Sequence, residues 1–345
     1  MSSKAKILLI YTGGTIGMFT DPITGSLKSI DLKKIENHIP ETAQLNVNLT
    51  TYAFNKPIDS SDASPEFWID LVSVIEKNYL DFDGFVILHG TDTMAYTGSA
   101  LSFMITNLIK PIVLTGAQLP LGTLRTDGKE NIISAIEIAA AKKKDGTSRV
   151  PEVTIFFEKK LFRANRTHKY NAEYFDAFIS PNFPPLAEAG IKIHFNDKFI
   201  INKEIRSVTS FYKKIDKNII LLKIFPGLTQ EYLNTILNLK GLKGVVIETF
   251  GSGNAPTEKW FIEELEKAIN RGIIIYNVTQ CNAGKVDMGR YETSRILKEI
   301  GIVSGYDITS EAAITKLMFL LGRNLSYKEL KYYLEQNIAG ELTKN

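Results

Sequence analysis

The sequence lacks the features of secreted and membrane proteins. It contains one cysteine, Cys281, so it cannot form an intramolecular disulfide, and this usage fits a reducing compartment. No apolar run reaches the roughly 18 residues typical of a transmembrane helix, and the first residues show no secretory leader pattern. We therefore expect a cytoplasmic protein that has no membrane partner.

The sequence also has little excess of charge of either sign and few histidines. The chain carries 41 Lys and Arg against 38 Asp and Glu, a net charge of +3, and the basic residues are scattered. This distribution argues against a nucleic-acid partner. The 4 histidines lie far apart in the sequence, so their spacing predicts no metal site.

Short runs rich in Ile and Val are abundant and alternate with helical patterns. With 345 residues, 44% hydrophobic and 23% charged, the chain has globular composition and enough length for two domains. Near-continuous apolar runs are typical of strands buried in a parallel sheet, so we predict an α/β fold. The predicted strands are 7–11, 85–88, 112–114, 153–157, 219–224, 245–248 and 273–278. The predicted helices are 65–78, 96–108, 128–142, 256–270 and 310–321.

A polar, less periodic segment interrupts this alternation between about residues 191 and 214. We interpret it as an interdomain linker. The expected organisation is an N-terminal α/β domain over residues 1–190, the linker 191–214, and a smaller C-terminal α/β domain over residues 215–345.

The first predicted strand ends in the glycine-rich turn "TGGTIG", Thr12–Gly17. A dinucleotide-binding turn would need glycine at position 12, and a Walker loop would end in G-K-[ST], so neither pattern fits. Gly13 and Gly14 permit a tight turn and the close approach of a ligand. The turn either presents a threonine hydroxyl for chemistry, or it is a tight strand-to-helix turn in which a threonine caps the helix.

A second run, "FVILHGTDTM", ends in a turn that contains Thr91 and Asp92. The carboxyl ends of strands in α/β sheets are where ligands bind, so this turn and the first would face one crevice. Alternatively, Asp92 or Thr93 caps the next helix. We interpret His89 as a buried, hydrogen-bonded packing residue.

A third segment, "DSSDASPEFW", precedes a helix that Ser64 and Pro65 are expected to start. Its short polar side chains would either bind the polar ends of a small ligand or act as capping residues. The candidates for ligand binding are Asp59, Ser60 and Ser61.

Together, "TGGTIG" and "GFVILHGTDTM" resemble the paired signatures of the L-asparaginase family. The run "LFRANRTHKYNAEYFDAFISPNFPPLAEAGI" is similar to its cytoplasmic, type I branch, and "GAQLP", "FGSGNAP" and "ITSEAAITKL" match further. The resemblance extends from about residue 6 to residue 322. Two such signatures in one chain are far more specific than either alone.

This resemblance implies a function and an architecture. The family hydrolyses L-asparagine to L-aspartate and ammonia through a threonine acyl-enzyme, without a metal or other cofactor. Its fold has a flavodoxin-like parallel sheet in the N-terminal, catalytic domain and a smaller α/β C-terminal domain. The members assemble as homodimers or homotetramers.

The resemblance also implies roles for individual residues. The nucleophile would be Thr15, and the other catalytic residues would be Thr91, Asp92 and Lys169. Amide hydrolysis by threonine needs a base, which Thr91 and Lys169 would supply as a relay. The substrate would be held by Asp59, Ser60, Ser61, Thr91 and Asp92. From spacing alone, Lys169 is more typical of a surface cation in a segment rich in lysine and arginine, and only the resemblance favours a catalytic role.

The sequence departs from the family at one catalytic position. Many members carry a tyrosine in the stretch after the first loop, but "MFTDPITGSLKSID" contains none. Tyr291, in "GKVDMGRYETS", is our candidate for this role. A packing role for Tyr291 is the alternative.

Two other functions are compatible with parts of the sequence. The amidohydrolase subunit of a tRNA-dependent amidotransferase shares the fold, but it carries an extra N-terminal domain and would be expected to have a basic face. A sensor of asparagine would have kept the fold and lost the chemistry, and would bind asparagine without turnover. A complete acyl-transfer set favours the enzyme over the sensor.

Overall fold

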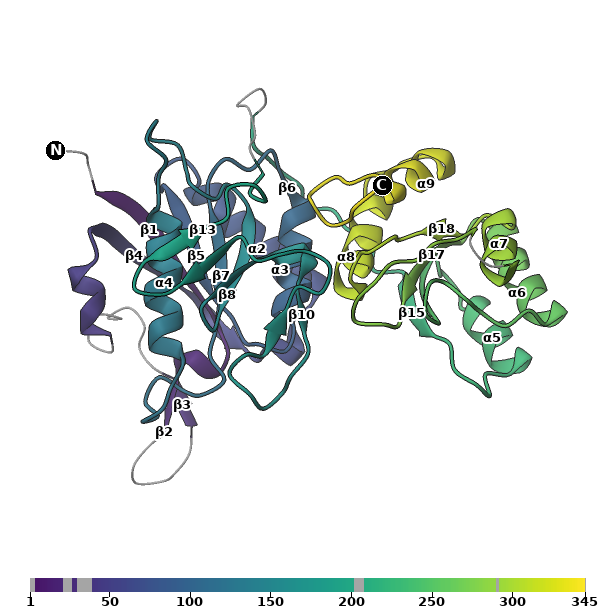
Figure 1. Ribbon diagram of the computed structural model, residues 1–345, viewed down its shortest axis with the longest axis horizontal. Coiled ribbons are helices and arrows are strands. Elements are labelled where there is room, and N and C mark those ends of the chain that lie inside the picture. The colour runs from purple at the N-terminus through teal and green to yellow at the C-terminus, as the bar shows by residue number, and fades with distance from the viewer. Residues whose placement is uncertain (1–3, 21–26, 30–38, 202–207, 290–291, 345) are drawn as a thin grey trace. The chain divides into compact units, whose positions relative to one another are not determined.

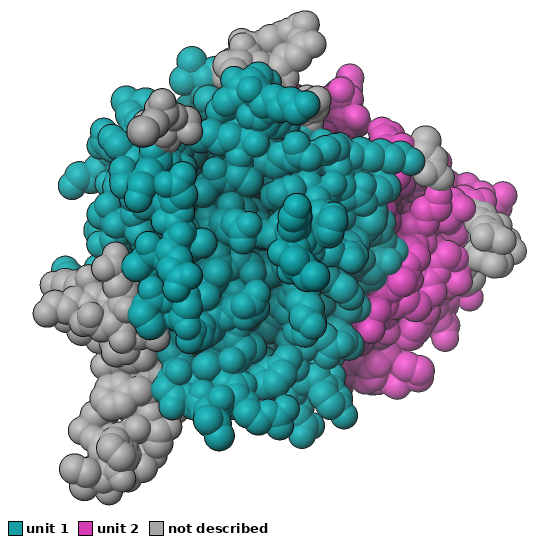
Figure 2. Space-filling view, turned by 60° about the vertical axis from the view of Figure 1, so that its left-hand side comes forward, with its two compact units in different colours: residues 1–213 teal, residues 214–345 magenta. Residues whose placement is uncertain are grey.

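The structure is a computed structural model that describes residues 4–20, 27–29, 39–201, 208–289 and 292–344 (Figure 1). The chain divides into two units, Met1–Lys213 and Lys214–Asn345, which Figure 2 shows in different colours. Each unit has its own sheet and its own buried apolar cluster. In the described residues, no helix is both long and apolar enough to cross a bilayer.

The first unit is built on an eight-stranded sheet with the order β13-β12-β9-β8-β7-β5-β1-β4. From β4 to β8 all neighbouring strands are parallel, and the pairs from β8 to β13 are antiparallel. Taken in chain order, the parallel part has the flavodoxin-like arrangement 2-1-3-4-5. The predicted α/β class and its flavodoxin-like sheet are therefore confirmed.

The strands of the first unit are β1 (Ala5–Gly13), β2 (Met18–Thr20), β3 (Leu27–Ser29), β4 (Val47–Ile58), β5 (Gly84–Leu88), β6 (Ile105–Thr106), β7 (Ile112–Thr115), β8 (Val153–Phe157), β9 (Lys160–Arg163), β10 (His168–Lys169), β11 (Phe178–Ile179), β12 (Ala187–Ala189), β13 (Ile193–Phe195) and β14 (Ser210–Phe211). Its helices are α2 (Pro65–Asn78), α3 (Met94–Met104) and α4 (Gly128–Ala140), with 3-10 turns η1 (Thr15–Gly17), η3 (Pro40–Gln44), η4 (Ser60–Asp62) and η5 (Ala164–Arg166).

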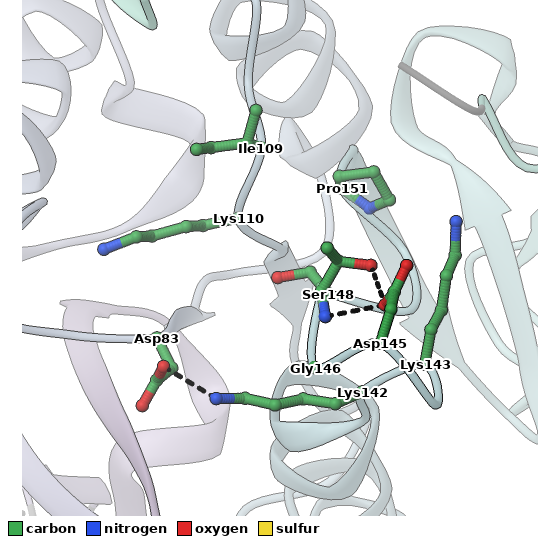
Figure 3. A pocket seen from close by; sticks show the side chains of 10 residues that line it. Asp83, Ile109, Lys110, Lys142, Lys143, Asp145, Gly146, Ser148 and Pro151 are labelled. Atoms are coloured by element: carbon green, nitrogen blue, oxygen red, sulfur yellow. Dashed lines mark hydrogen bonds and ion pairs between the residues drawn. The ribbon is translucent and has the colours of Figure 1, made fainter. Parts of the chain in front are cut away.

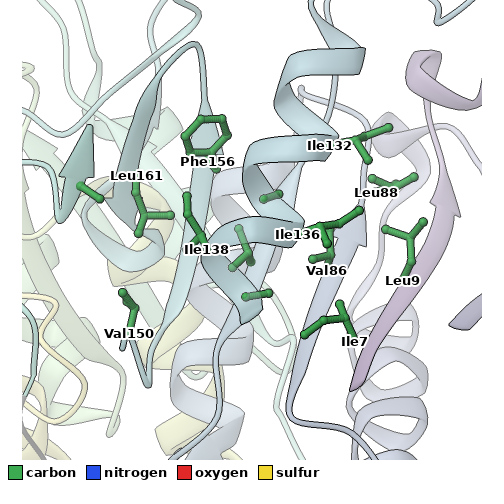
Figure 4. Packing of buried hydrophobic residues seen from close by; sticks show 14 of the residues in the cluster. Ile7, Leu9, Val86, Leu88, Ile132, Ile136, Ile138, Val150, Phe156 and Leu161 are labelled. Atoms are coloured by element: carbon green, nitrogen blue, oxygen red, sulfur yellow. The ribbon is translucent and has the colours of Figure 1, made fainter. Parts of the chain in front are cut away.

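Helix α4 covers one face of this sheet. Side chains alternate along a strand, so Ile7 and Leu9 of β1 point to the same face of the sheet. Val86 of β5 lies opposite Leu9 in the register and therefore shares that face. These side chains pack with Ile132 and Ile136 of α4 in one buried cluster, as Figure 4 shows. The strands β5, β7 and β8 are buried along their whole length, as their apolar runs predicted.

Helices α2 and α3 belong to the other face. Tyr79, at the end of α2, stacks on Phe85 of β5 with ring centroids 6.0 Å apart. Ser64 accepts a hydrogen bond from the backbone N–H of Phe67, and Pro65 occupies the first helical position, so α2 starts where the sequence indicates.

The segment 191–214, which the sequence pattern marked as a linker, contributes to the first unit. Within it, β13 pairs with β12 at the edge of the large sheet, and β14 pairs with β6. The first unit accordingly extends to Lys213, where the expected domain ended at residue 190. The side chains of β13 and β14 are half-buried, except that of His194, which is exposed, so the segment lacks the continuous apolar run of a central strand.

The second unit contains a four-stranded sheet with the order β15-β16-β17-β18, in which all pairs are parallel. It comprises β15 (Ile219–Lys223), α5 (Gln230–Leu237), β16 (Gly244–Thr249), α6 (Lys259–Asn270), β17 (Ile274–Thr279), α7 (Glu292–Glu299), β18 (Val303–Ser304), α8 (Ser310–Leu321) and α9 (Tyr327–Glu335). This is the smaller α/β domain that the sequence predicted.

Candidate active site

The two threonine-bearing turns lie at the point where the strand order of the large sheet reverses. The strand β1 pairs with β4 on one side and with β5 on the other, and the two turns follow the carboxyl ends of β1 and β5. In open α/β sheets this switch point is where ligands bind. The segment 59–62 follows β4, the other neighbour of β1.

Glycines allow the three loops to approach each other. A Cβ on Gly14 would lie 2.6 Å from Cα of Gly90, and a Cβ on Gly90 would lie 2.5 Å from Oγ of Ser60. A Cβ on Gly13 would lie 2.0 Å from the backbone carbonyl oxygen of Ile58. The first and second turns are therefore in contact through their backbones, and the second turn also lies against the side chain of Ser60, so side chains at Gly14 and Gly90 would separate the three loops.

Lys169 joins this cluster from a distant part of the sequence. Its Nζ lies 2.8 Å from Oγ1 of Thr91 and 2.6 Å from Oδ1 of Asp92. The side chain of Lys169 is 15% exposed and that of Asp92 63%. Lys169 lies in β10, whose pairing with β11 holds this part of the chain. The structure thus brings together three of the predicted catalytic residues in one hydrogen-bonded group.

Gln118 completes the surroundings of Thr91. The Thr91 hydroxyl donates to Oε1 of Gln118 at 3.3 Å, and the Gln118 amide donates to the carbonyls of Ala172 and Tyr174 at 3.2 and 3.1 Å. Sequence reasoning missed this residue. One sequence feature could have indicated it: Gln118 lies in the motif "GAQLP", which follows β7 at the same edge of the sheet as the two threonine-bearing turns.

The candidate substrate-binding residues at 59–61 have different surroundings. Ser60 is buried and its carbonyl accepts a hydrogen bond from the Thr93 hydroxyl at 2.6 Å. Asp59 and Ser61 are exposed, and Oδ1 of Asp59 accepts from the N–H and the hydroxyl of Ser61, both at 2.9 Å. Both hydrogen bonds hold the pKa of Asp59 below its usual value, and the bond from the backbone N–H of Ser61 has the larger effect. Asp59 therefore caps η4, which is the alternative to ligand binding that the sequence allows for this residue.

Two threonines and one histidine of these turns form hydrogen bonds with other groups of the same unit. The Thr12 hydroxyl is buried and donates to the carbonyl of Leu88 at 2.9 Å, so it stabilises the sheet. Thr93 is bonded to Ser60 as described. His89 is buried and hydrogen-bonded through both ring nitrogens, as predicted for a packing residue.

Two predicted catalytic groups are not described. The backbone of Thr15 starts η1, directly after Gly14, but its side chain lies outside the described part of the structure. Tyr291 lies outside the described residues altogether. The described residues include no group of three or more His, Cys, Asp or Glu side chains arranged to hold a metal ion.

A cavity of about 380 Å³ lies at the opposite end of the strands (Figure 3). Four of its charged side chains, those of Asp83, Lys110, Lys142 and Asp145, are engaged with an opposite charge, a hydroxyl or backbone groups. Lys142 lies 2.9 Å from Asp83, Lys110 donates to the carbonyls of Tyr79 and Phe82, and Asp145 accepts from Thr147. Since Asp83 and Lys110 precede β5 and β7, this cavity is separate from the cluster around Thr91.

Comparisons with known proteins agree with this arrangement. Residues 6–200 match the family model "Asparaginase, N-terminal", and residues 218–334 match "Glutaminase/Asparaginase C-terminal domain". The chain is 42% identical to L-asparaginase 1 of Escherichia coli over 99% of its own length and 98% of that protein. Over 98% of its length it is 32% identical to the L-asparaginase of Thermococcus kodakarensis, of which it spans 99%.

The fold is also similar to that of a solved structure. The crystal structure of L-asparaginase I from Vibrio cholerae matches with a TM-score of 0.89 and 39% sequence identity, over 99% of this chain and 100% of that one. Matches to both family models over most of the chain, and this level of identity, identify the protein as a member of the L-asparaginase family.

Proposed function

We propose that this protein is an L-asparaginase, which hydrolyses the side-chain amide of L-asparagine to give L-aspartate and ammonia. The observation that carries the proposal is the contact of Lys169 with both Thr91 and Asp92, beside a turn in which Gly14, the residue before Thr15, touches Gly90 of the same loop. Family membership supports the same reaction. No cofactor takes part in the proposed chemistry.

In the first half-reaction, the hydroxyl oxygen of Thr15 attacks the carbon of the substrate's side-chain amide. The carbon–nitrogen bond breaks, and the nitrogen leaves as ammonia after it receives the proton lost by Thr15. The aspartyl group remains as an ester on Thr15. We propose that Tyr291 assists this step, because no tyrosine occurs in the stretch after the first turn.

In the second half-reaction, water attacks the ester and releases aspartate, and its proton returns the threonine to its hydroxyl form. We assign to Thr91 and Lys169 the removal of the proton from the attacking hydroxyl or water. At rest, the Thr91 hydroxyl accepts from Lys169 and donates to Gln118. Relay therefore requires this hydroxyl to rotate and donate to the amine in its uncharged form.

The substrate's charged ends need complementary groups. Asp92 is largely exposed while it holds Lys169, so its carboxylate still has capacity for the α-ammonium group of asparagine. Ser60 and Ser61 are proposed to hold the other polar end, with Asp59 acting on them through its bonds to Ser61.

Two broader properties are proposed with the activity. The protein would act in the cytoplasm, because its single cysteine is unpaired and exposed, which fits a reducing compartment. It would assemble as a homodimer or homotetramer, as the family resemblance implies. Cell fractionation and light scattering on the purified protein test these two points.

Ammonia release over a range of L-asparagine concentrations tests the activity, with Thr15→Ala and Thr91→Ala beside the wild type. We expect saturable turnover in the wild type and its loss in both variants. Trapping of a covalent aspartyl adduct on Thr15 would identify the nucleophile. Binding of asparagine without turnover would instead indicate a sensor, and activity only with a tRNA-dependent partner would indicate an amidotransferase component.

A further inference from the structure

A chain of buried hydrogen bonds leads from helix α2 to the catalytic turn. The indole Nε1 of Trp68 lies 3.1 Å from the Thr97 hydroxyl, and this hydroxyl lies 2.9 Å from Nε2 of His89. Nδ1 of His89 in turn lies 2.6 Å from the carbonyl oxygen of Gly90. Trp68, Thr97 and His89 are 5%, 0% and 1% exposed, so water does not compete for these bonds.

The chemistry of the two ends determines where each proton lies. A carbonyl oxygen only accepts, so Nδ1 of His89 must carry the proton and donate to Gly90. An indole N–H only donates, so Thr97 accepts from Trp68 and uses its own proton to donate to Nε2 of His89. Burial lowers the pKa of His89 to about 4, which keeps the ring neutral near pH 7, as this arrangement requires.

The bond to Gly90 determines the orientation of the next peptide group. A trans peptide is planar, so the carbonyl of Gly90 and the N–H of Thr91 point in opposite directions. With the carbonyl held by the imidazole, the Thr91 N–H points away from the buried ring. In the part of the chain that the structure describes, the Thr91 N–H makes no hydrogen bond.

We propose that His89 is a positioning residue that holds the Gly90–Thr91 peptide so that the Thr91 N–H is free to stabilise the negative charge of the tetrahedral intermediate. This inference rests on the proposed function. The Thr91 N–H is part of the turn that carries Thr91 and Asp92, and Gly90 touches Gly14, the residue before Thr15. A donor held before reaction stabilises the transition state without reorganisation.

Two substitutions separate the two bonds that His89 makes. In His89→Asn, the amide nitrogen occupies nearly the position of Nδ1 and still donates to Gly90. In His89→Gln, the amide reaches nearly to the position of Nε2, so the bond to Thr97 is kept and the bond to Gly90 is lost. Both variants remove a buried ring, and Ile75→Val, at a buried position of the helix that carries Trp68, serves as a control for mild destabilisation.

The assay is ammonia release with L-asparagine, fitted for kcat and KM and accompanied by melting temperatures. We expect His89→Gln to lose about 10- to 100-fold in kcat with KM within about threefold, somewhat less than the 10²- to 10³-fold typical of deleting one oxyanion donor. His89→Asn should keep kcat within about threefold. Ile75→Val should melt earlier than the wild type with unchanged kcat.

The inference is overturned if His89→Gln keeps the wild-type kcat, or if both His89 variants lose activity in proportion to their melting temperatures. Thr97→Val provides a second test should His89→Gln not fold, because it removes the bond that orients the ring while keeping a similar shape. It should lower kcat severalfold at constant KM, and an unchanged kcat also overturns the inference. Absence of turnover in the wild type would refute the proposed function instead.

Discussion

Substitution of Gly14 tests whether the proposed active site depends on backbone contact between the Thr15 loop and the Thr91 loop. The φ of Gly14 is +83°, and a Cβ would lie 2.6 Å from both N and Cα of Gly90, roughly 0.8 Å short of an ordinary contact at 3.4 Å. Gly14→Ala must therefore push the Thr15 loop away from the Thr91 loop by nearly that amount, because the opposing atoms are backbone and cannot rotate aside.

The expected cost has two parts. The left-handed backbone conformation costs an alanine about 1 to 2 kcal/mol, and overpacking adds about 1 to 3 kcal/mol. A misplacement of about 1 Å between reacting groups typically costs about 10²-fold in rate. We therefore expect Gly14→Ala to fold with reduced stability and to lose about 100-fold in kcat/KM for asparagine.

Gly146 supplies a matched control. Its φ is also +83°, but no atom lies within 4 Å of its would-be Cβ. Gly146→Ala should therefore lose only about 1 to 2 kcal/mol of stability, a fall in melting temperature of roughly 2 to 8 °C for a unit of this size, at unchanged kcat/KM. Wild-type kcat/KM in Gly14→Ala, or an equal loss of kcat/KM in both variants, would refute the reasoning.

Three further predictions concern charged and titratable groups. Lys169→Met should lower kcat by about 10² to 10⁴-fold in the ammonia assay, because positioned proton transfer typically contributes that much; a loss below tenfold contradicts the relay. The folded-state pKa of His89, about 4, lies below the unfolded value of 6.5, so the unfolded chain takes up a proton first as the pH falls. Stability should decline from pH 6.5 toward pH 4 by about 3 kcal/mol from this group, and urea titrations of wild type and His89→Asn should differ in that window. Lys316→Met should cost about 3 to 5 kcal/mol in the same titrations, because it leaves Glu341, 2.6 Å away and fully buried, without its charge partner, whereas exposed Lys328→Met should change stability by less than about 0.5 kcal/mol.

Much of the sheet and helix pattern was predictable from local sequence. The bounds of α2 and α8 agree with the prediction, because a capping Ser64 with Pro65 marks one and a polar N-cap, Thr309, precedes an apolar run in the other. The buried strands β5, β7 and β8 were recognisable from continuous apolar runs. Helix α3 begins at Met94 and ends at Met104, earlier than predicted at both ends, since Thr93 is its N-cap and β6 follows directly.

Other strands were invisible in the sequence. The strand β4 lies at the sheet edge with largely exposed or half-buried side chains, so its residues Val47–Ile58 include charged and polar types. The short antiparallel strands β12 and β13 gain their pairing from the sheet next to them. Their local propensity is overridden by tertiary contacts, and the same effect made 191–214 look like a linker.

The sequence by itself determined the chemical content of the protein: the two threonine turns, their glycines, and the family to which they belong. Only the tertiary structure decided which groups meet. Lys169 reaches Asp92 across 77 residues of sequence, and Gln118 reaches Thr91 across 27. The physical reason is that strand order is set by parallel pairing between distant segments, while local patterns report only burial and periodicity. The reversal at β1 places the ends of β1 and β5 side by side, and that long-range pairing creates the site.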